Sequence, residues 1–167
     1  FEANSPYSMA RIQAVYAARY FRTLGIRAYV GYLFHHESPL RKENHVSKII
    51  VNAAKKISKG GTEKIKIGDL SVRKEWGYAK DMVEGIFTLL NQEGVFEATI
   101  GTGKAYSIED WMEICFRQIG KKWSDYVCIE NNFISEYQVL YSNPESINRC
   151  GWNATTSFVD LAKIMMA

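Results

Sequence analysis

The stretch IRAYVGYLF, residues 26–34, is a nearly continuous apolar and aromatic run, and the polar loop HHESPLRKEN follows it directly at residues 35–44. Such a run is typical of a strand buried on both faces, as in the parallel sheets of α/β proteins. In open α/β sheets, ligands bind beyond the carboxyl ends of the strands. We therefore expect a parallel sheet with a binding site where this run meets the polar loop.

The flanking sequence alternates between helical and strand patterns. A helix is expected from residue 6 to about residue 24, because Ser5 is a favourable N-cap, Pro6 suits the first helical position and Gly25 can end the helix. The later pattern indicates a helix at 46–57, a strand at 63–70, a strand and a helix within 72–94, a strand at 95–103, a helix at 107–119 and short helices within 143–152 and 156–166. Ser107 and Asp110 are expected to form a capping box that opens the helix at 107–119. The apolar spacing predicts the inner faces of the three longer helices as Val46, Ile49, Ile50, Ala53 and Ile57; Met82, Val83, Ile86, Leu89 and Leu90; and Ile108, Trp111, Met112, Cys115, Phe116 and Ile119. Strands that alternate with helices predict an α/β fold.

Composition and charge narrow the class of protein. A chain of 167 residues with 47% hydrophobic residues can bury a core as one domain. It has neither a long apolar run nor a signal-peptide pattern, so we expect a soluble cytoplasmic protein without a membrane partner. The net charge of +3 is too small to indicate a nucleic-acid partner. The three cysteines, Cys115, Cys128 and Cys150, are expected to be reduced, buried thiols and not disulfides or metal ligands.

Tyr7 and Arg11 lie four residues apart in the first expected helix, and Ala14 and Ala18 continue the same face. A tyrosine beside a cation can serve in proton transfer, because the positive charge favours the phenolate form. Tyrosine and arginine at this spacing on a surface helix are more commonly only a solvated pair. The spacing alone leaves both interpretations open.

Five segments occur in one order along nearly the whole chain: SPYSMAR, GYLFHHESPLRKENHVSKII, IGDLSVRKEWGYAKDMVEGIFTLL, IGTGKAYSIEDW and NPESINRCGWNATTSFVDLAKIMM. Together they resemble the extended short-chain dehydrogenase/reductases that act on nucleotide sugars, and among these the GDP-mannose 4,6-dehydratases. The glycine-rich cofactor-binding segment that opens family members is absent. The resemblance implies that residues 1–167 are a C-terminal half, in which about 1–36 end a Rossmann-like nucleotide-binding sheet and about 37–167 form mainly a small α/β substrate-binding lobe.

The resemblance implies roles for four residues toward a cofactor, NADP or NAD. Tyr7 matches the family's catalytic tyrosine, which transfers a proton and also contacts the cofactor. Arg11 stands where the family has a lysine; arginine keeps the charge but is larger and forked. His36 and Arg41 match cofactor-binding positions, although His36 could equally only cap the end of the strand.

The resemblance also implies contacts with a nucleotide-sugar substrate. His35 replaces a substrate-binding asparagine, and Lys74 corresponds to a basic residue near the diphosphate. Phe133 stands where the family has a phosphate-binding arginine, so a charge-assisted contact is lost there. The residues that we assign to substrate on this basis are His35, Val46, Lys74 and Glu136.

The activity implied for the parent protein is the NADP-dependent dehydration of a nucleotide hexose to a 4-keto-6-deoxy sugar. A hydride would leave C4 for the cofactor, water would be lost across C5 and C6, and the hydride would return to C6. An epimerase or reductase of the same family, or an inactive homologue that acts by binding, also fits the departures at Arg11, His35 and Phe133. We expect the full-length protein to be a homo-oligomer and the isolated chain to be inactive.

Overall fold

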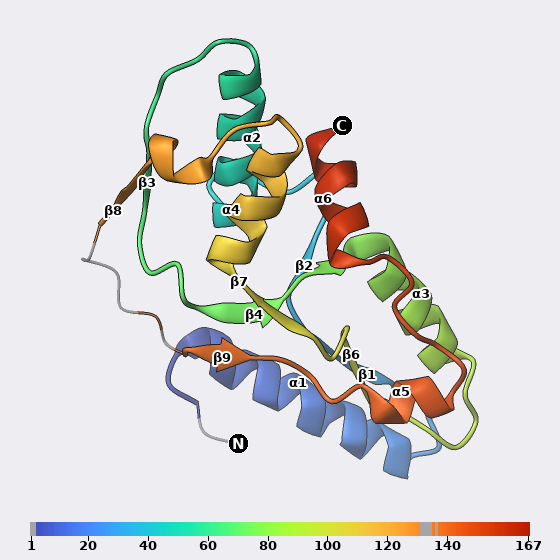
Figure 1. Ribbon diagram of the computed structural model, residues 1–167. Helices are drawn as coiled ribbons and strands as arrows, with labels where there is room; N and C mark the ends of the chain where they lie inside the picture. The colour runs from blue at the N-terminus through green and yellow to red at the C-terminus, as the bar shows by residue number, and fades with distance from the viewer. Residues whose placement is uncertain (1–2, 131–134, 136) are drawn as a thin grey trace.

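The computed structural model describes residues 3–130, 135 and 137–167 (Figure 1). Glu136 and Phe133 lie outside the described residues. The helices are α1 (Pro6–Thr23), α2 (Val46–Ser58), α3 (Ala79–Leu90), α4 (Ile108–Arg117), α5 (Glu145–Arg149) and α6 (Phe158–Met166), with one 3-10 turn, η1 (Trp123–Tyr126). The strands are β1 (Val30–Leu33), β2 (His36–Glu37), β3 (Ile65–Ile67), β4 (Arg73–Glu75), β5 (Gly77–Tyr78), β6 (Glu97–Ile100), β7 (Ala105–Ser107), β8 (Val127–Ile129) and β9 (Val139–Leu140).

The predicted α/β class is confirmed, and most of the strand pairs are parallel. β1 pairs with β6, β2 with β5 and β3 with β8, each in parallel register. β4 lies between β7, to which it is antiparallel, and β9, to which it is parallel. β2 lies inside the segment 35–44, which the sequence indicated as a loop, because His36 and Glu37 pair with Gly77 and Tyr78.

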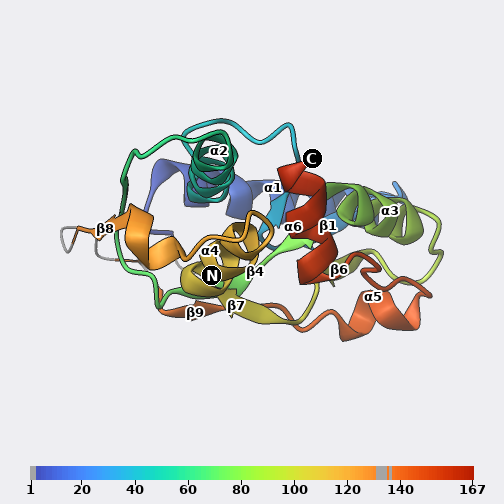
Figure 2. The same ribbon diagram turned by 45° about the horizontal axis from the view of Figure 1, so that its top comes forward.

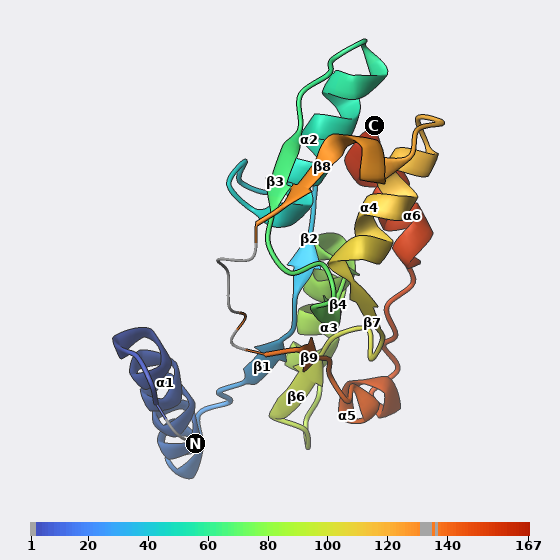
Figure 3. The same cartoon turned by 60° about the vertical axis from the view of Figure 1, so that its left-hand side comes forward.

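α1 begins and ends as predicted. Ser5 caps it by accepting a hydrogen bond from the Ser8 backbone N–H at 3.1 Å, and Gly25 follows it with a φ of +81°. No residue of α1 is buried, and Figure 3 shows the helix standing apart from the rest of the chain. Two arginines tie it to β6: Arg19 binds the Glu97 carboxylate through two hydrogen bonds of 2.8 Å, and Arg22 also bonds this carboxylate. α1 is therefore held to the described chain by polar contacts and not by a buried apolar face.

The prediction that β1 is buried on both faces is wrong for this chain. Leu33 is 45% exposed and Gly31 is also exposed, and the strand begins at Val30 instead of Ile26. Among the described residues, β6 is the only strand that pairs with β1. α3 contacts β1, whereas α1 buries none of its own residues against β1. One face of the segment 26–34 therefore stays uncovered.

The larger core lies among α2, α4 and α6, which Figures 1 and 2 show packed side by side. The rings of Trp76 and Trp111 stack at its centre with their centroids 4.6 Å apart. The predicted capping box of Ser107 and Asp110 opens α4, and its predicted inner face is buried, apart from Ile119, which is half-buried beyond the helix end. The buried residues of α4 are Ile108, Trp111, Met112, Cys115 and Phe116.

A smaller core lies between α3, β6 and α5. Here the predicted inner face of α3 is partly wrong, because Val83 and Leu90 are exposed and Gly85 is buried. A Cβ atom at Gly85 would lie 2.8 Å from Ile100 Cγ2 and 3.0 Å from Trp152 Cε2. The close approach of Ile100 and Trp152 therefore requires glycine, and the buried face of α3 passes through Gly85 instead of Val83 and Leu90.

The inner face predicted for α2 is partly wrong too. Ile50 and Ile57 are buried as expected, whereas Ile49 is exposed. Val51, Ala54 and Ser47 are buried in addition, because α4 and α6 both contact this helix.

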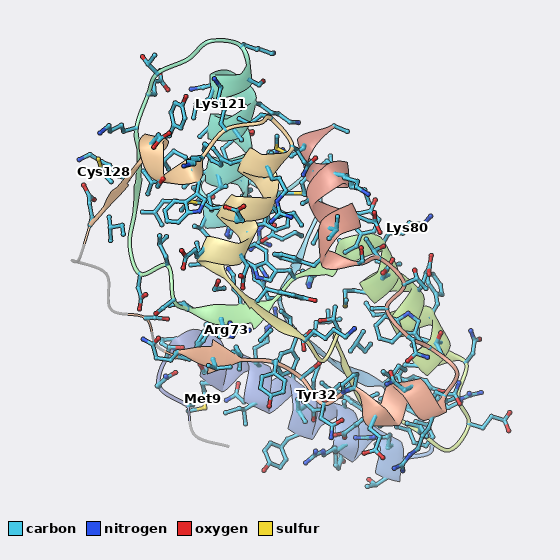
Figure 4. The ribbon with its side chains drawn as sticks, in the orientation of Figure 1. Met9, Tyr32, Arg73, Lys80, Lys121 and Cys128 are labelled. Carbon is cyan, nitrogen blue, oxygen red and sulfur yellow. The ribbon has the colours of Figure 1, made fainter. Side chains whose placement is uncertain are left out.

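The cysteines are free, as expected, but only Cys115 is buried. Cys128 is exposed on β8 and is labelled at the edge of the molecule in Figure 4, and Cys150 is half-buried. Across the described residues, no helix combines the length and apolar character needed to cross a bilayer. The division of the chain near residue 36 stays a prediction.

Candidate cofactor and substrate site

The predicted face of α1 lines a cavity of about 790 Å³ between this helix and β1. Tyr7, Arg11, Ala14 and Ala18 all contribute to its wall, and β1 and His36 form the opposite side. Figure 4 labels Tyr32 on β1, next to α1. The structure thus places three of the residues assigned to the cofactor, Tyr7, Arg11 and His36, around one cavity that runs along β1.

Within this cavity, Arg11 lies over the face of the Tyr7 ring, with its guanidinium carbon 5.1 Å from the ring centroid. This distance is typical of a cation–π contact. Tyr7 is 69% exposed, so its phenol is accessible from the cavity side. The positive charge lies near the tyrosine, as the sequence predicted, but over the ring face.

A second cavity, of about 360 Å³, adjoins the first through His36. Four basic side chains line it: His36, Arg41, Lys42 and His45. Arg41 donates from Nη2 to Nδ1 of His45 at 3.0 Å, and its Nε lies 3.4 Å from Glu37 Oε2. A pocket with this excess of basic groups suits phosphate oxygens, for which a guanidinium is a forked donor.

His36 connects the two cavities, and one ring nitrogen also caps the strand. Its Nδ1 lies 2.8 Å from the carbonyl oxygen of Phe34. A carbonyl only accepts, so Nδ1 is the protonated nitrogen and Nε2 remains for another partner. Capping and ligand contact, the two alternatives that the sequence left open for His36, are therefore compatible.

Beneath the loop, the substrate candidates His35 and Lys74 meet Glu37, which is 1% exposed. His35 donates from Nδ1 to the Glu75 carbonyl at 2.8 Å. Its Nε2 lies 3.0 Å from Glu37 Oε1 and 3.2 Å from Lys74 Nζ. Lys74 is 8% exposed, and its Nζ also lies 4.8 Å from the centroid of the Trp76 ring.

Burial shifts the ionisation of this cluster. It lowers the pKa of Lys74 to about 8, while the attraction of Glu37 acts in the opposite direction. Burial likewise lowers the pKa of His35, although its contact with the Glu37 carboxylate acts in the opposite direction. For Glu37, burial acts to raise the pKa, but contacts with His35, Ser47 and Arg41 lower it by more, so the carboxylate is ionised.

Val46, the other substrate candidate, opens α2 and packs half-buried against the larger core. Sequence reasoning missed Glu37 and Glu75. A single acid inside the basic loop HHESPLRK, and another inside the basic strand RKEW, are the signals that could have found them. In the part of the chain that the structure describes, no three His, Cys, Asp or Glu side chains gather as metal ligands would.

Glu75 connects, through hydrogen bonds, the segments of the chain next to the site. It is fully buried and accepts hydrogen bonds from the backbone N–H groups of Thr102 at 2.6 Å, Gly103 at 3.0 Å and Ser142 at 2.5 Å. The Ser142 hydroxyl also bonds to it. Glu75 therefore ties β4 to the turn after β6 and to the segment after β9.

Comparison with known proteins agrees with this architecture. A family model described as GDP-mannose 4,6 dehydratase matches residues 1–165. GDP-mannose 4,6 dehydratase 2 of Arabidopsis thaliana is 31% identical over 170 residues, which are 99% of this chain and 46% of that protein. The chain thus spans about half the length of this curated relative.

Solved structures share the fold at low identity. RMD from Pseudomonas aeruginosa complexed with NADPH superposes with a TM-score of 0.89 at 14% identity, over 99% of this chain and 56% of that one. The dTDP-glucose 4,6-dehydratase of Bacillus anthracis in complex with NAD gives a TM-score of 0.83 at 19% identity, over 99% and 52%. These likenesses confirm the predicted Rossmann-like fold, and together with the match over residues 1–165 they show that the chain belongs to the GDP-mannose 4,6-dehydratase family of extended short-chain dehydrogenase/reductases.

Proposed function

We propose that the full-length protein is an NADP- or NAD-dependent dehydratase of a nucleotide hexose, resembling GDP-mannose 4,6-dehydratase. The observation that carries the proposal is the cavity in which Tyr7, Arg11 and His36 meet, next to the basic pocket of Arg41. The names of the relatives support the reaction, and the NADPH and NAD bound in neighbouring structures support the cofactor. The homo-oligomer and the cytoplasmic location stay predictions.

The residues present fit a dinucleotide cofactor, because an open cavity beside β1 adjoins a pocket of basic groups suited to phosphate. When bound, the nicotinamide accepts a hydride and returns it. Arg11 and His36 would hold the cofactor in the first cavity, and Arg41 would hold phosphate or ribose oxygens in the second. Tyr7, exposed to the first cavity and close to the Arg11 charge, would transfer the proton.

On the substrate side, His35, Val46, Lys74 and Glu136 would contact the nucleotide sugar. Lys74 is buried with its Nζ next to His35. It would therefore act on the diphosphate through its positive charge, with His35 lying between them, and not by direct contact.

A binding-only homologue is the second candidate, favoured by the position of Arg11. Its guanidinium lies over the face of the Tyr7 ring. The lysine at this position in the family would instead bind the ribose. Substitution Arg11→Lys in the full-length protein separates the two: a large gain in turnover would indicate an enzyme with an impaired site, and unchanged absence of turnover would favour the binding role.

The first test is calorimetric titration of the full-length protein with GDP, UDP, CDP and dTDP hexoses, with and without NADP. We expect one nucleotide class to bind, with Tyr7→Phe retaining this binding and losing turnover. Tyr16→Phe is the matched control, because Tyr16 is an exposed tyrosine of the same helix with Arg19 5.8 Å from its ring, outside the cavity. Absence of binding by every nucleotide sugar would refute the dehydratase proposal.

A further inference from the structure

Glu37 is a buried carboxylate in a pocket otherwise rich in basic groups. It is 1% exposed in β2, and it is the single acidic side chain among the described residues that line the 360 Å³ cavity. A carboxylate at such a depth is unfavourable unless cations or hydrogen-bond donors compensate its charge. Its position between the cofactor candidate Arg41 and the substrate candidate His35 therefore calls for a specific role.

Each oxygen of Glu37 faces one of these two residues. Oε1 lies 3.0 Å from His35 Nε2, and Oε2 lies 3.4 Å from Arg41 Nε. His35 Nε2 also lies 3.2 Å from Lys74 Nζ, and burial lowers the pKa of His35, so this ring is not a permanent cation beside the carboxylate. Arg41, which stays protonated in proteins, is then the permanent cation that faces the carboxylate directly.

Arg41 is held along two edges. Glu37 faces its Nε, and His45 Nδ1 accepts from its Nη2 at 3.0 Å. Among the described residues, neither Arg41 Nε nor the Glu37 oxygens make a hydrogen bond, so Glu37 acts on the guanidinium through its charge at 3.4 Å. The hydrogen bond to His45 fixes one edge of the planar group and leaves its other Nη–H groups available. The side chain of Arg41 is 28% exposed, which places these remaining donors on the cavity side.

The loop itself is fixed independently of Glu37. The Arg41 backbone N–H donates to the Ser38 carbonyl at 2.9 Å, and Lys48 Nζ donates to the Pro39 carbonyl at 2.8 Å. Loss of the Glu37 charge would therefore release the Arg41 side chain and leave the backbone path of the loop in place.

We infer that Glu37 is a positioning residue, which aims the Arg41 guanidinium at an anionic oxygen of the bound nucleotide without touching the nucleotide itself. The inference rests on the proposed role of Arg41 in cofactor binding. Prior orientation of a donor strengthens binding, because less side-chain freedom is lost when the ligand arrives.

The first experiment measures NADPH affinity of the full-length protein by calorimetry. We expect Glu37→Met, which fills the volume but offers no acceptor, to raise the dissociation constant about tenfold, and Glu37→Gln, which keeps one oxygen, to raise it less. Combining Glu37→Met with Arg41→Gln should add little to the loss from Arg41→Gln alone, because both changes remove one interaction. Unchanged affinity in Glu37→Met, or fully additive losses, would overturn the inference. Glu43→Gln, an exposed acid of the same loop, is the matched control.

A second experiment is independent of the cofactor. In NMR spectra of the ligand-free wild-type protein, the Arg41 Nε–H should exchange with water more slowly than that of Arg117, an exposed arginine that contacts Glu113 at 3.3 Å. Equal rates, or an Arg41 signal insensitive to Glu37→Met, would overturn the positioning role. A slow Arg41 signal that Glu37→Met abolishes, in a protein that binds no NADPH, would support the positioning of Arg41 and refute the proposed cofactor role.

Discussion

Replacement of Glu75 by glutamine tests how much the hydrogen bonds of this buried carboxylate contribute to the stability of the fold around the site. Oε1 of the buried carboxylate accepts from Gly103 N and from both the backbone and the hydroxyl of Ser142, while Oε2 accepts from Thr102 N. Glutamine has one carbonyl oxygen and one NH₂ group. Because all the neighbours are donors, the NH₂ group must face at least one N–H that points at it.

The cost follows from these contacts. A hydrogen bond to a charged group contributes about 1.5–3 kcal/mol, and a buried donor left without an acceptor costs about 1–3 kcal/mol. If the glutamine oxygen takes the three-donor position of Oε1, the Thr102 N–H alone loses its acceptor. We therefore expect Glu75→Gln to lower the free energy of unfolding by about 2–4 kcal/mol, mainly by loosening the turn after β6.

Urea denaturation followed by tryptophan fluorescence measures this loss, because Trp76 follows Glu75 directly in the core. Glu93→Gln, an exposed acid in the loop before β6, is the control and should change stability by less than about 0.5 kcal/mol. A Glu75→Gln protein as stable as the wild type would show that the four contacts contribute no net free energy, and the reasoning would be wrong.

Three further predictions concern ionisable groups. Burial lowers the pKa of Lys74 in the folded protein to about 8 from 10.5, so between these pH values the unfolded state binds more protons. The unfolding free energy of the wild type should therefore rise with pH across this window by about 3 kcal/mol relative to Lys74→Met, and parallel pH profiles in denaturant titrations would contradict this. The hydrogen bond from Arg19 lowers the pKa of Glu97 to about 2, so the attachment of α1 to β6 through Glu97 is present above the ordinary pKa of 4.5 and is lost as pH falls through 2. Glu97→Gln should therefore accelerate hydrogen exchange in α1 but not in α3. Equal protection of α1 in the wild type and the variant would contradict this role of Glu97. Burial raises the pKa of Cys115 to about 12, whereas Cys128 is exposed; a thiol reagent should label Cys128 first and Cys115 only after unfolding, and early labelling of Cys115 would refute its burial.

Local signals in the sequence predicted the elements well. The Ser5 and Ser107 caps and the glycine after α1 gave helix boundaries that the structure confirms, because capping depends on a few neighbouring residues. The inner faces of α2 and α3 were less predictable. Which apolar residues are buried there depends on partners distant in sequence, such as Trp152 against Gly85.

By itself, the sequence determined the α/β class, the family and the shared face of Tyr7 and Arg11, because these depend on periodicity and on the order of motifs along the chain. Only the tertiary structure revealed that Glu37 and Lys74, 37 positions apart, enter one buried cluster with His35. It also showed that β1 is left partly uncovered and that Glu75 joins β4 to the turn after β6 and to the segment after β9. The free energy of burying a charge depends on which donors and cations the fold brings around it, and no local pattern of residues contains that information.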